Sequence, residues 1–289
     1  MRQKYLAPLA AVPRGVGQIM LQGNVWTGLL FLVGIFYDSI TMGAGALLAT
    51  AIGTATAMLL RYPAEEIAQG LYGFSAALVG VALTFYFAAQ PVIWIALAAG
   101  SVLAAIFQHA LIRRNIPGFT LPFIVITWVF LFLFRHVFVV PPSAEVTAAL
   151  PVYQDFTVST HGFGEVIFQG SMTAGLLFFL GVFVSSPIAA LYGMAASVVG
   201  AWISMQCAEP TDDIHMGLFS FNAVLCAIAF AGNRKRDGLY VLIAVLLAVF
   251  IDMGMLLGNM TVLTFPFVLA SWITLIIKKT FDKIKPYHA

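Results

Sequence analysis

Apolar residues fill most of this chain, in runs of about twenty residues separated by short polar breaks. A helix of about 20 apolar residues is long enough to cross the hydrocarbon core of a bilayer, so each run predicts a membrane-spanning helix. The pattern predicts about ten spans, over residues 16–36, 42–60, 67–88, 91–112, 119–138, 166–184, 188–205, 214–231, 239–257 and 262–277. The expected fold is an all-α polytopic membrane protein, with residues 1–289 forming one membrane domain.

Composition supports the same fold class and removes several function classes. Hydrophobic residues make up 61% of the chain and charged residues 9%, with a mean hydropathy of +0.98; soluble domains carry about 25% charged residues. The sequence contains no metal-ligand spacing, nucleophile elbow or glycine-rich phosphate loop. We therefore expect no metal, no cofactor, no nucleic-acid partner and no enzymatic activity.

The basic residues predict which side of the membrane each loop occupies. Cytoplasmic loops collect Lys and Arg, and an inside N-terminus places thirteen of the fourteen basic residues on the inner side. The exception is Arg135, while the predicted outer connections carry acidic residues such as Glu145 and Asp155. Both termini are therefore expected to be cytoplasmic, with ten crossings between them.

The chain contains an internal repeat. Residues 14–36 and 161–183 align without gaps and share ten identities in 23 positions, and "GLYGFSAALVG" from Gly70 aligns with "GLFSFNAVLCA" from Gly217 at the same offset of 147. Farther along, "TLPF" from Thr120 matches "TFPF" from Thr264 at an offset of 144. Repeat one covers residues 1–147 and repeat two residues 148–289. Five spans per half, an odd number, predict an inverted-topology repeat with a pore at the repeat interface.

Two matched pairs of polar residues lie in this apolar background. Gln18 and Glu165 occupy equivalent positions near the start of each half, so inversion places them near opposite mouths of a path. A carboxylate at the bilayer centre costs about 2.5–3.5 kcal/mol on insertion scales, so Glu165 is expected to face water. Thr120 and Thr264 each lie two residues before a proline, which frees backbone carbonyls that are tolerated only inside protein or along a cavity.

Matched apolar residues accompany these polar pairs: Leu21 with Phe168, Phe74 with Phe221, and Leu78 with Leu225. Residues four apart, such as Phe74 and Leu78, share one face of a helix. Spacing alone is more typical of core or lipid-facing residues than of a pore wall. Asp252, late in the ninth predicted span, reads as an interfacial or hydrogen-bonded carboxylate at a helix end in preference to a proton-coupling site.

At these motifs the sequence resembles the urea transporter family. "IPGFTLPF", residues 116–123, resembles the family signature LPxxTxPF, and "MTVLTFPF", residues 260–267, resembles its second copy. "NVWTGLLFLVGIF" and "GLYGFSAALVG" are similar to further family motifs. The chain departs from the signatures at Ile116, Met260 and Thr261, and carries Ser75 where the family often has asparagine.

The resemblance implies passive permeation of urea through a pore within each protomer of a homotrimer in a bacterial inner membrane, with urea and membrane lipid as partners. Carried over position by position, it implies that each half supplies part of the pore wall. The first half would supply Gln18, Leu21, Phe74, Leu78 and Thr120, and the second Glu165, Val166, Phe168, Phe221, Leu225 and Thr264.

The chemistry of urea suits such a wall, although other functions stay open. Urea is planar and neutral, so facing phenyl and isobutyl groups form a slot of its shape, and oxygens at the slot's edge accept its N–H groups. A channel for ammonia, water or short amides would need a similar slot. A proton-coupled transporter would respond to a pH gradient, and an intramembrane enzyme would need a paired acid and base that Glu165 and Asp252 alone do not supply.

Overall fold

A computed structural model describes residues 2–144, 158–206 and 220–284 of the chain. Within these ranges the elements are helices, accompanied by one isolated β-bridge between Phe87 and Pro142. In chain order they are α1 (Arg2–Gly17), the 3₁₀ helix η1 (Gln18–Met20), α2 (Val25–Asp38), α3 (Ile40–Leu59), α4 (Ala64–Ala68), α5 (Phe74–Tyr86), α6 (Pro91–Arg113), α7 (Leu121–Phe132), the π-helix η2 (Leu133–Val137), α9 (Val158–Glu165), α10 (Met172–Ser185), α11 (Pro187–Gln206), α13 (Phe221–Phe230), α14 (Lys235–Leu257) and α15 (Phe265–Ile284).

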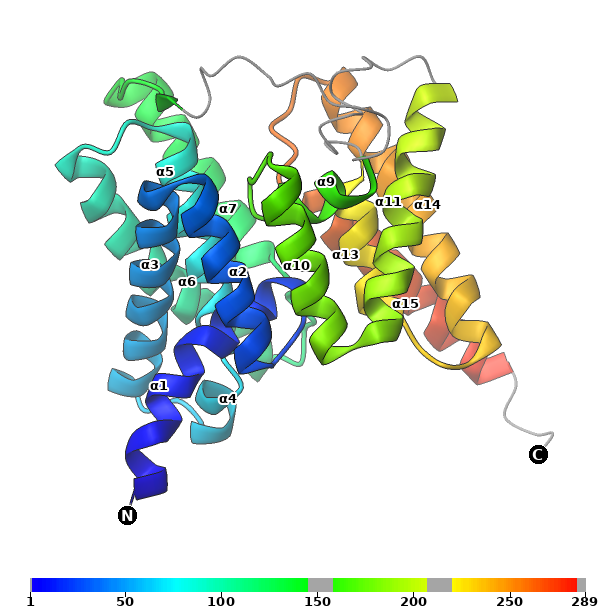
Figure 1. Cartoon of the computed structure of the whole chain (residues 1–289), viewed down its shortest axis with the longest axis horizontal. Coiled ribbons are helices and arrows are strands. Elements are labelled where there is room, and N and C mark those ends of the chain that lie inside the picture. Colours follow the sequence, from blue (N-terminus) through cyan, green and yellow to red (C-terminus); the bar gives the residue numbers. More distant parts are fainter. Residues whose placement is uncertain (1, 145–157, 207–219, 285–289) are drawn as a thin grey trace.

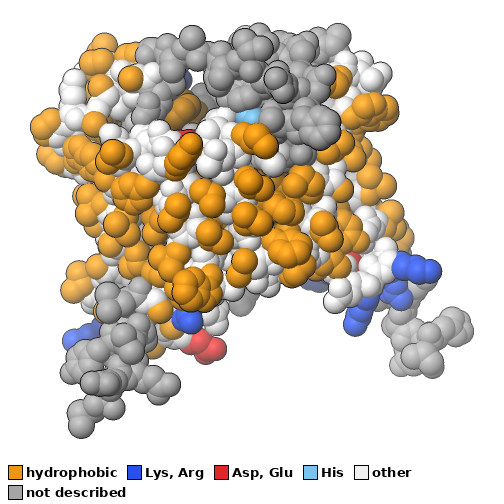
Figure 2. All heavy atoms as spheres, in the orientation of Figure 1, with side chains coloured by type: hydrophobic (Ala, Val, Ile, Leu, Met, Phe, Trp, Pro, Cys, Tyr) orange, Lys and Arg blue, Asp and Glu red, His pale blue; other side chains and the backbone are white. Residues whose placement is uncertain are grey.

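The helices have the lengths and surfaces of an integral membrane protein, which confirms the predicted fold class. Among the described residues, α3, α6, α11 and α14 are each long and apolar enough to cross a membrane, and the bent pair Ala10–Met20 and Val25–Asp38 can form a fifth span. Hydrophobic side chains cover the face seen in Figure 2, and most of the visible Lys and Arg side chains lie toward one end. α1 begins and α15 ends at that end (Figure 1).

The prediction of one continuous helix over residues 16–36 is wrong. α1 ends at Gly17 and η1 at Met20, and α2 starts at Val25 at an angle of 76° to the segment Ala10–Met20. Leu21 has a left-handed backbone with φ 61°, which no helix interior accommodates. The side-chain oxygen of Asn24 then accepts a hydrogen bond from the Trp26 amide at 2.9 Å and caps α2. The predicted span 166–184 is interrupted in the same way, because Phe168 has φ 59° and α10 starts only at Met172.

Several other predicted spans are shorter than expected. α5 begins at Phe74, inside the predicted span 67–88, and its 13 residues rise about 20 Å, less than the hydrocarbon thickness of about 30 Å. α7 and α15 begin at Leu121 and Phe265, directly after the matched threonines, with a proline in the first helical turn. Residues 214–219 of the eighth predicted span lie outside the described residues, and α13 covers Phe221–Phe230.

The helix breaks satisfy their backbone groups internally, as the interior of a membrane requires. At the first break, the Leu21 amide donates to the Gln18 carbonyl at 2.9 Å, and the Gln22 amide donates to the Gly17 carbonyl at 3.1 Å. The Gln22 side chain donates to the Met20 carbonyl at 3.0 Å. At the second break, Gln169 makes the matching side-chain bond to the Ile167 carbonyl at 2.8 Å. Each break is therefore a closed hydrogen-bonded turn.

α2 and α10 lie side by side at the centre of the molecule and run antiparallel (Figure 1). Near the start of α2, the Thr27 hydroxyl donates to the Gly181 carbonyl of α10 at 2.6 Å. In the middle, the rings of Phe31 and Phe178, which are repeat mates, meet edge to face with centroids 5.1 Å apart. At the end of α2, Asp38 accepts hydrogen bonds from the Ser171 hydroxyl and amide at the start of α10.

Two tryptophan side chains donate hydrogen bonds to the signature segment of the opposite half. Trp128 of α7 donates from Nε1 to the Thr261 carbonyl at 2.8 Å, and Trp272 of α15 donates from Nε1 to the Pro117 carbonyl at 2.7 Å. Donors and acceptors both lie 144 residues apart, so the two bonds are equivalent. Each half therefore fixes the backbone just before the other half's signature threonine.

Close approach of the backbones at α2 requires Gly28, and its mate Gly175 plays the same part at α10. A Cβ on Gly28 would overlap the carbonyl oxygen of Pro13, and a Cβ on Gly175 would overlap that of Thr160. Both oxygens belong to the backbone, which cannot rotate away from a new Cβ as a flexible side chain would. Gly254 of α14 is different, because a Cβ there meets no atom within 4 Å.

We expect Gly28→Ala to destabilise the protein by about 1–3 kcal/mol, because the methyl group forces α1 and α2 apart. The measurement is the temperature at which detergent-purified protein loses its monodisperse peak in size-exclusion chromatography after heating. Gly254→Ala is the matched control and should melt no lower than wild type, since alanine favours a helix over glycine. Equal melting temperatures for Gly28→Ala and Gly254→Ala would contradict the packing described here.

Candidate functional site

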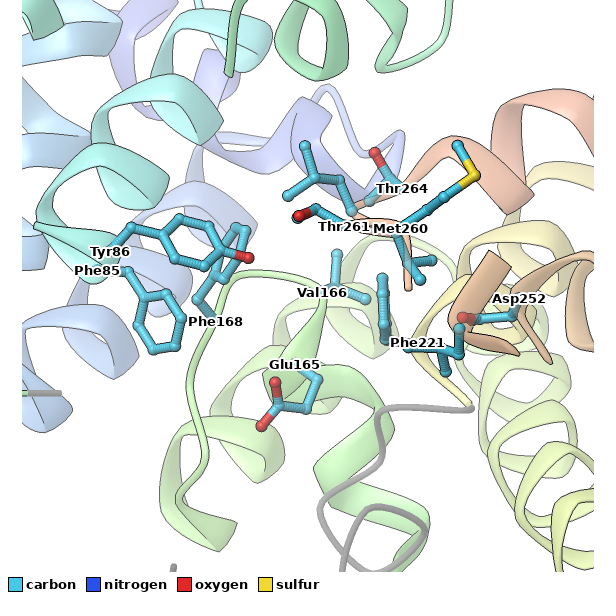
Figure 3. A pocket seen from close by; sticks show the side chains of 13 residues that line it. Phe85, Tyr86, Glu165, Val166, Phe168, Phe221, Asp252, Met260, Thr261 and Thr264 are labelled. Carbon is cyan, nitrogen blue, oxygen red and sulfur yellow. The ribbon is translucent and has the colours of Figure 1, made fainter. Parts of the chain in front are cut away.

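A pocket of about 260 Å³ opens where α5, α9, α13, α14 and the second signature meet (Figure 3). Aromatic rings occupy one side, Phe221 and Asp252 the other, and Glu165 lies apart from both groups in this view. Its lining residues are Phe85, Tyr86, Glu165, Val166, Phe168, Phe221, Asp252, Leu256, Met260, Thr261, Val262, Leu263 and Thr264. The wall is thus mostly apolar, with a few oxygens, as is usual for sites that bind small molecules.

Three rings, Phe85, Tyr86 and Phe168, form the aromatic side of the pocket, and we call them the aromatic trio. Phe85 lies 5.1 Å from both Tyr86 and Phe168 between ring centroids, and Tyr86 meets Phe168 edge to face at 5.9 Å. The left-handed backbone of Phe168 directs its ring to this place after α9 ends. The helix break is therefore what delivers Phe168 from repeat two to two rings of repeat one.

Glu165 lies at the last residue of α9, where the chain turns out of the helix. The turn is closed by bonds from the Ile167 and Gln169 amides to the Gly164 carbonyl, at 2.9 and 3.1 Å. The Glu165 side chain is half-buried and borders the pocket. Its matched residue Gln18 instead donates from Nε2 to the Gln69 carbonyl at 3.1 Å.

Asn222 joins three helices behind the pocket wall. Its Nδ2 donates to Asp252 Oδ2 at 2.9 Å and to the Leu263 carbonyl at 3.2 Å, and its Oδ1 accepts from the Phe267 amide at 3.2 Å. Asp252 is 1% exposed, and its bond to Asn222 confirms the interpretation of it as a hydrogen-bonded carboxyl group. Leu263 has a left-handed backbone, which Asn222 stabilises through the carbonyl.

The two signature threonines touch each other at the junction of the halves. Thr120 Oγ1 and Thr264 Oγ1 are 2.7 Å apart and hydrogen-bonded, and both residues are buried. The residues before them, Phe119 and Leu263, have nearly equal φ values of 45° and 47°. Thr264 also lines the pocket, so Thr120 is one hydrogen bond away from it.

The structure brings five of the predicted pore residues together in this pocket and leaves the others outside it. Glu165, Val166, Phe168, Phe221 and Thr264 line the pocket. Thr120 contacts it through Thr264. Gln18, Leu21, Phe74, Leu78 and Leu225 are not among its lining residues, and both matched leucines, Leu78 and Leu225, are fully buried. For these residues a place in the pore wall stays a prediction.

Sequence reasoning missed several lining residues. Met260, Thr261, Val262 and Leu263 belong to the second signature itself, so its whole approach to Thr264 could have been proposed as wall. Asp252 had a signal in its match to Gln108, because α6 and α14 correspond at an offset of 144. Phe85 and Tyr86 had none, because they belong to no motif and reach the pocket only through the packing of α5 against Phe168.

The pocket chemistry suits a small flat solute that donates hydrogen bonds. The aromatic trio and Phe221 provide ring faces, while Thr261, Thr264, Asp252 and Glu165 provide oxygens. Oxygen acceptors on an otherwise apolar wall favour a ligand with several N–H groups over a hydrated ion. Within the described residues, no group of three or more His, Cys, Asp or Glu side chains could hold a metal ion.

Comparison with known proteins fits this arrangement. Residues 9–279 match the family model described as urea transporter. Urea transporter 1 of Ovis aries is 29% identical over 241 residues, covering 76% of this chain and 62% of the relative. Urea transporter 1 of Mus musculus is 28% identical over 239 residues with the same coverage. The chain thus spans about 62% of the length of these curated relatives.

The family model extends over both signatures, both helix breaks and the pocket they enclose. This chain belongs to the urea transporter family.

Proposed function

We propose that this protein carries urea passively across a membrane, through a narrow path between its two halves. The observation that supports this most directly is the pocket, which combines flat ring faces with oxygen acceptors and is walled by the second signature up to Thr264. Urea offers four N–H donors on a planar frame, and such a wall accepts them after they leave water. Membership of the urea transporter family is the reason for choosing urea as the solute. The residues that line the pocket have the shape and the hydrogen-bond acceptors that urea requires.

The path continues from the pocket past the bonded pair Thr120 and Thr264 into the first half. In this proposal Phe74 and Phe221, which match at an offset of 147, flank the junction, and Leu78 and Leu225 follow one helical turn later on the same helix faces. A middle lined by apolar groups without formal charge makes ions lose hydration at a large cost. A neutral molecule loses less, which favours urea over ions of similar size.

We propose further that the halves, residues 1–147 and 148–289, are inverted repeats with a pore at their interface and about ten crossings. The antiparallel contact of α2 and α10, the reciprocal tryptophan bonds, and the matched left-handed residues support this. The short apolar helices α5 and α13 support it too, because discontinuous helices are typical of such transporters. The family resemblance supports a homotrimer in a bacterial inner membrane.

The first test is urea permeability of the purified protein in liposomes, measured by stopped-flow light scattering. We expect urea to cross at least about tenfold faster than acetamide or glycerol, because acetamide has fewer N–H donors than urea and glycerol has none and is not planar. The rate should not change when a pH gradient is imposed. Equal rates for all three solutes would favour a general small-solute channel, and acceleration by the gradient would favour a proton-coupled transporter.

Glu165→Ala and Phe221→Ala should each lower urea flux about tenfold or more, equivalent to about 1.4 kcal/mol in the barrier. The first removes an acceptor at the mouth, and the second removes a ring face from the pocket wall. Flux per folded protomer in vesicles is the measurement. Phe250→Ala is the matched control, because Phe250 lies on α14 with 57% of its surface exposed. Wild-type flux in both pocket variants would refute the site.

Both termini are proposed to be cytoplasmic, because one end of the molecule carries the start of α1, the end of α15 and most basic residues. A protease-cleavable tag at each terminus should resist protease added to intact spheroplasts and be cleaved after lysis. Cleavage of one tag alone before lysis would indicate an odd number of crossings and contradict the inverted repeat.

A further inference from the structure

The pocket contains more acidic side chains than a site for a neutral solute needs. Two of its lining residues are acidic, Glu165 and Asp252, while none of the 13 described lining residues is Lys, Arg or His. Asp38, close to Glu165 in the fold, has its carboxylate bonded to Ser171. No basic group therefore belongs to the described pocket wall, and the Arg135 guanidinium lies beside it, over the Tyr86 ring.

The first half carries carboxamides at both matched positions. Gln18 corresponds to Glu165 at an offset of 147, and Gln108 corresponds to Asp252 at an offset of 144. Both differences exchange a neutral amide for an acid of nearly the same shape, and both lie on the same side of the junction. Urea presents the same donors to either half, so its recognition does not account for the difference.

Asp252 has an acceptor that no described group uses. It is 1% exposed and lines the pocket, and its Oδ2 is occupied by Asn222. Its Oδ1 is buried and has no hydrogen-bond partner within the described residues. A buried carboxylate oxygen without a donor is costly, and a ligand with charged N–H groups removes that cost more completely than a neutral one.

The aromatic trio also suits a cation. The Arg135 guanidinium lies over the ring of Tyr86, with Cζ 5.5 Å from the ring centroid. The protein itself therefore places a guanidinium group on a member of the trio, in a neighbouring pocket that shares Met260 and Thr261 with this one. Ring faces attract cations through their quadrupole, and Phe85 and Phe168 extend the same surface into the pocket.

We propose that this pocket binds small planar monovalent cations of the guanidinium class, with Asp252 Oδ1 accepting their N–H groups, Glu165 adding negative charge and the aromatic trio covering one face. Guanidinium has the planar shape of urea, with a third amino group in place of the carbonyl oxygen and a positive charge. It fits the same slot, but the uncharged middle of the path retains it, so it acts as a blocker of urea from the pocket side. This inference rests on the proposed function only for that blocking effect.

The test is direct binding of guanidinium chloride to the purified full chain in detergent, by isothermal titration calorimetry. Concentrations stay in the millimolar range, far from denaturing, and potassium chloride holds ionic strength constant. We expect guanidinium to bind about tenfold more tightly than urea, because charge-assisted hydrogen bonds are about twice as strong as neutral ones. Tetramethylammonium, which is bulky and has no N–H group, should bind more weakly than guanidinium.

Two conservative variants attribute the binding to the pocket. Asp252→Asn keeps an oxygen for Asn222 to bond, and Glu165→Gln installs the residue that the first half has at Gln18. Each should lower the ratio of guanidinium to urea affinity about tenfold, the loss expected for one charge-assisted contact. Glu65→Gln, on the exposed surface of α4, is the matched control and should leave the ratio unchanged.

Two results would overturn this inference. One is guanidinium binding no tighter than urea in the wild type, and the other is an unchanged affinity ratio in both Asp252→Asn and Glu165→Gln. Binding through Asp252 in a protein that fails the urea flux test would support this inference and refute the proposed function. If urea flux is present but guanidinium neither slows it nor binds, the proposed function would be supported and this inference would be refuted.

Discussion

The need to satisfy every backbone group inside a membrane shapes this molecule more than any other constraint. A break in a buried helix frees amides and carbonyls that have no water to bond. At Leu21 and Phe168 the chain closes each break with a tight turn and a glutamine side chain. A break closed in this way can direct a backbone carbonyl into the interior of the protein. A continuous helix at the same depth cannot do so, because its carbonyls are bonded within the helix. The pocket is built from such breaks.

The same constraint ties the halves together. The backbone before each signature threonine is held by a tryptophan from the opposite half, and the threonines bond each other. These bonds cross from one half to the other, so the local structure before each threonine depends on both halves. Residues brought from both halves, such as Tyr86 and Phe168, then meet at distances that a single repeat could not set.

The two halves share the same sequence of turns and helix contacts, as expected of a duplicated unit. The matched positions that carry different residues show where the chemistry of the halves differs. Matched residues repeat the turns, caps and close helix contacts. Three matched polar positions differ between the halves: Gln18 corresponds to Glu165, Gln108 to Asp252, and Ser75 to Asn222. Asn222 bonds three helices, whereas Ser75 Oγ is buried without a partner within the described residues. At these three positions the second half is therefore the more acidic, and at the third it is the more strongly hydrogen-bonded.

Sequence by itself determined the membrane class, the repeat and the matched polar pairs, because hydropathy and self-similarity are local properties of the chain. It also placed Glu165, Phe168, Phe221 and Thr264 among the candidates that now share one pocket. Only the tertiary structure decided where the spans break, because left-handed residues such as Leu21 and Phe168 leave no mark in an apolar run. Only it brought Phe85 and Tyr86 to the wall, because their places depend on packing between helices distant in sequence, which no local pattern records.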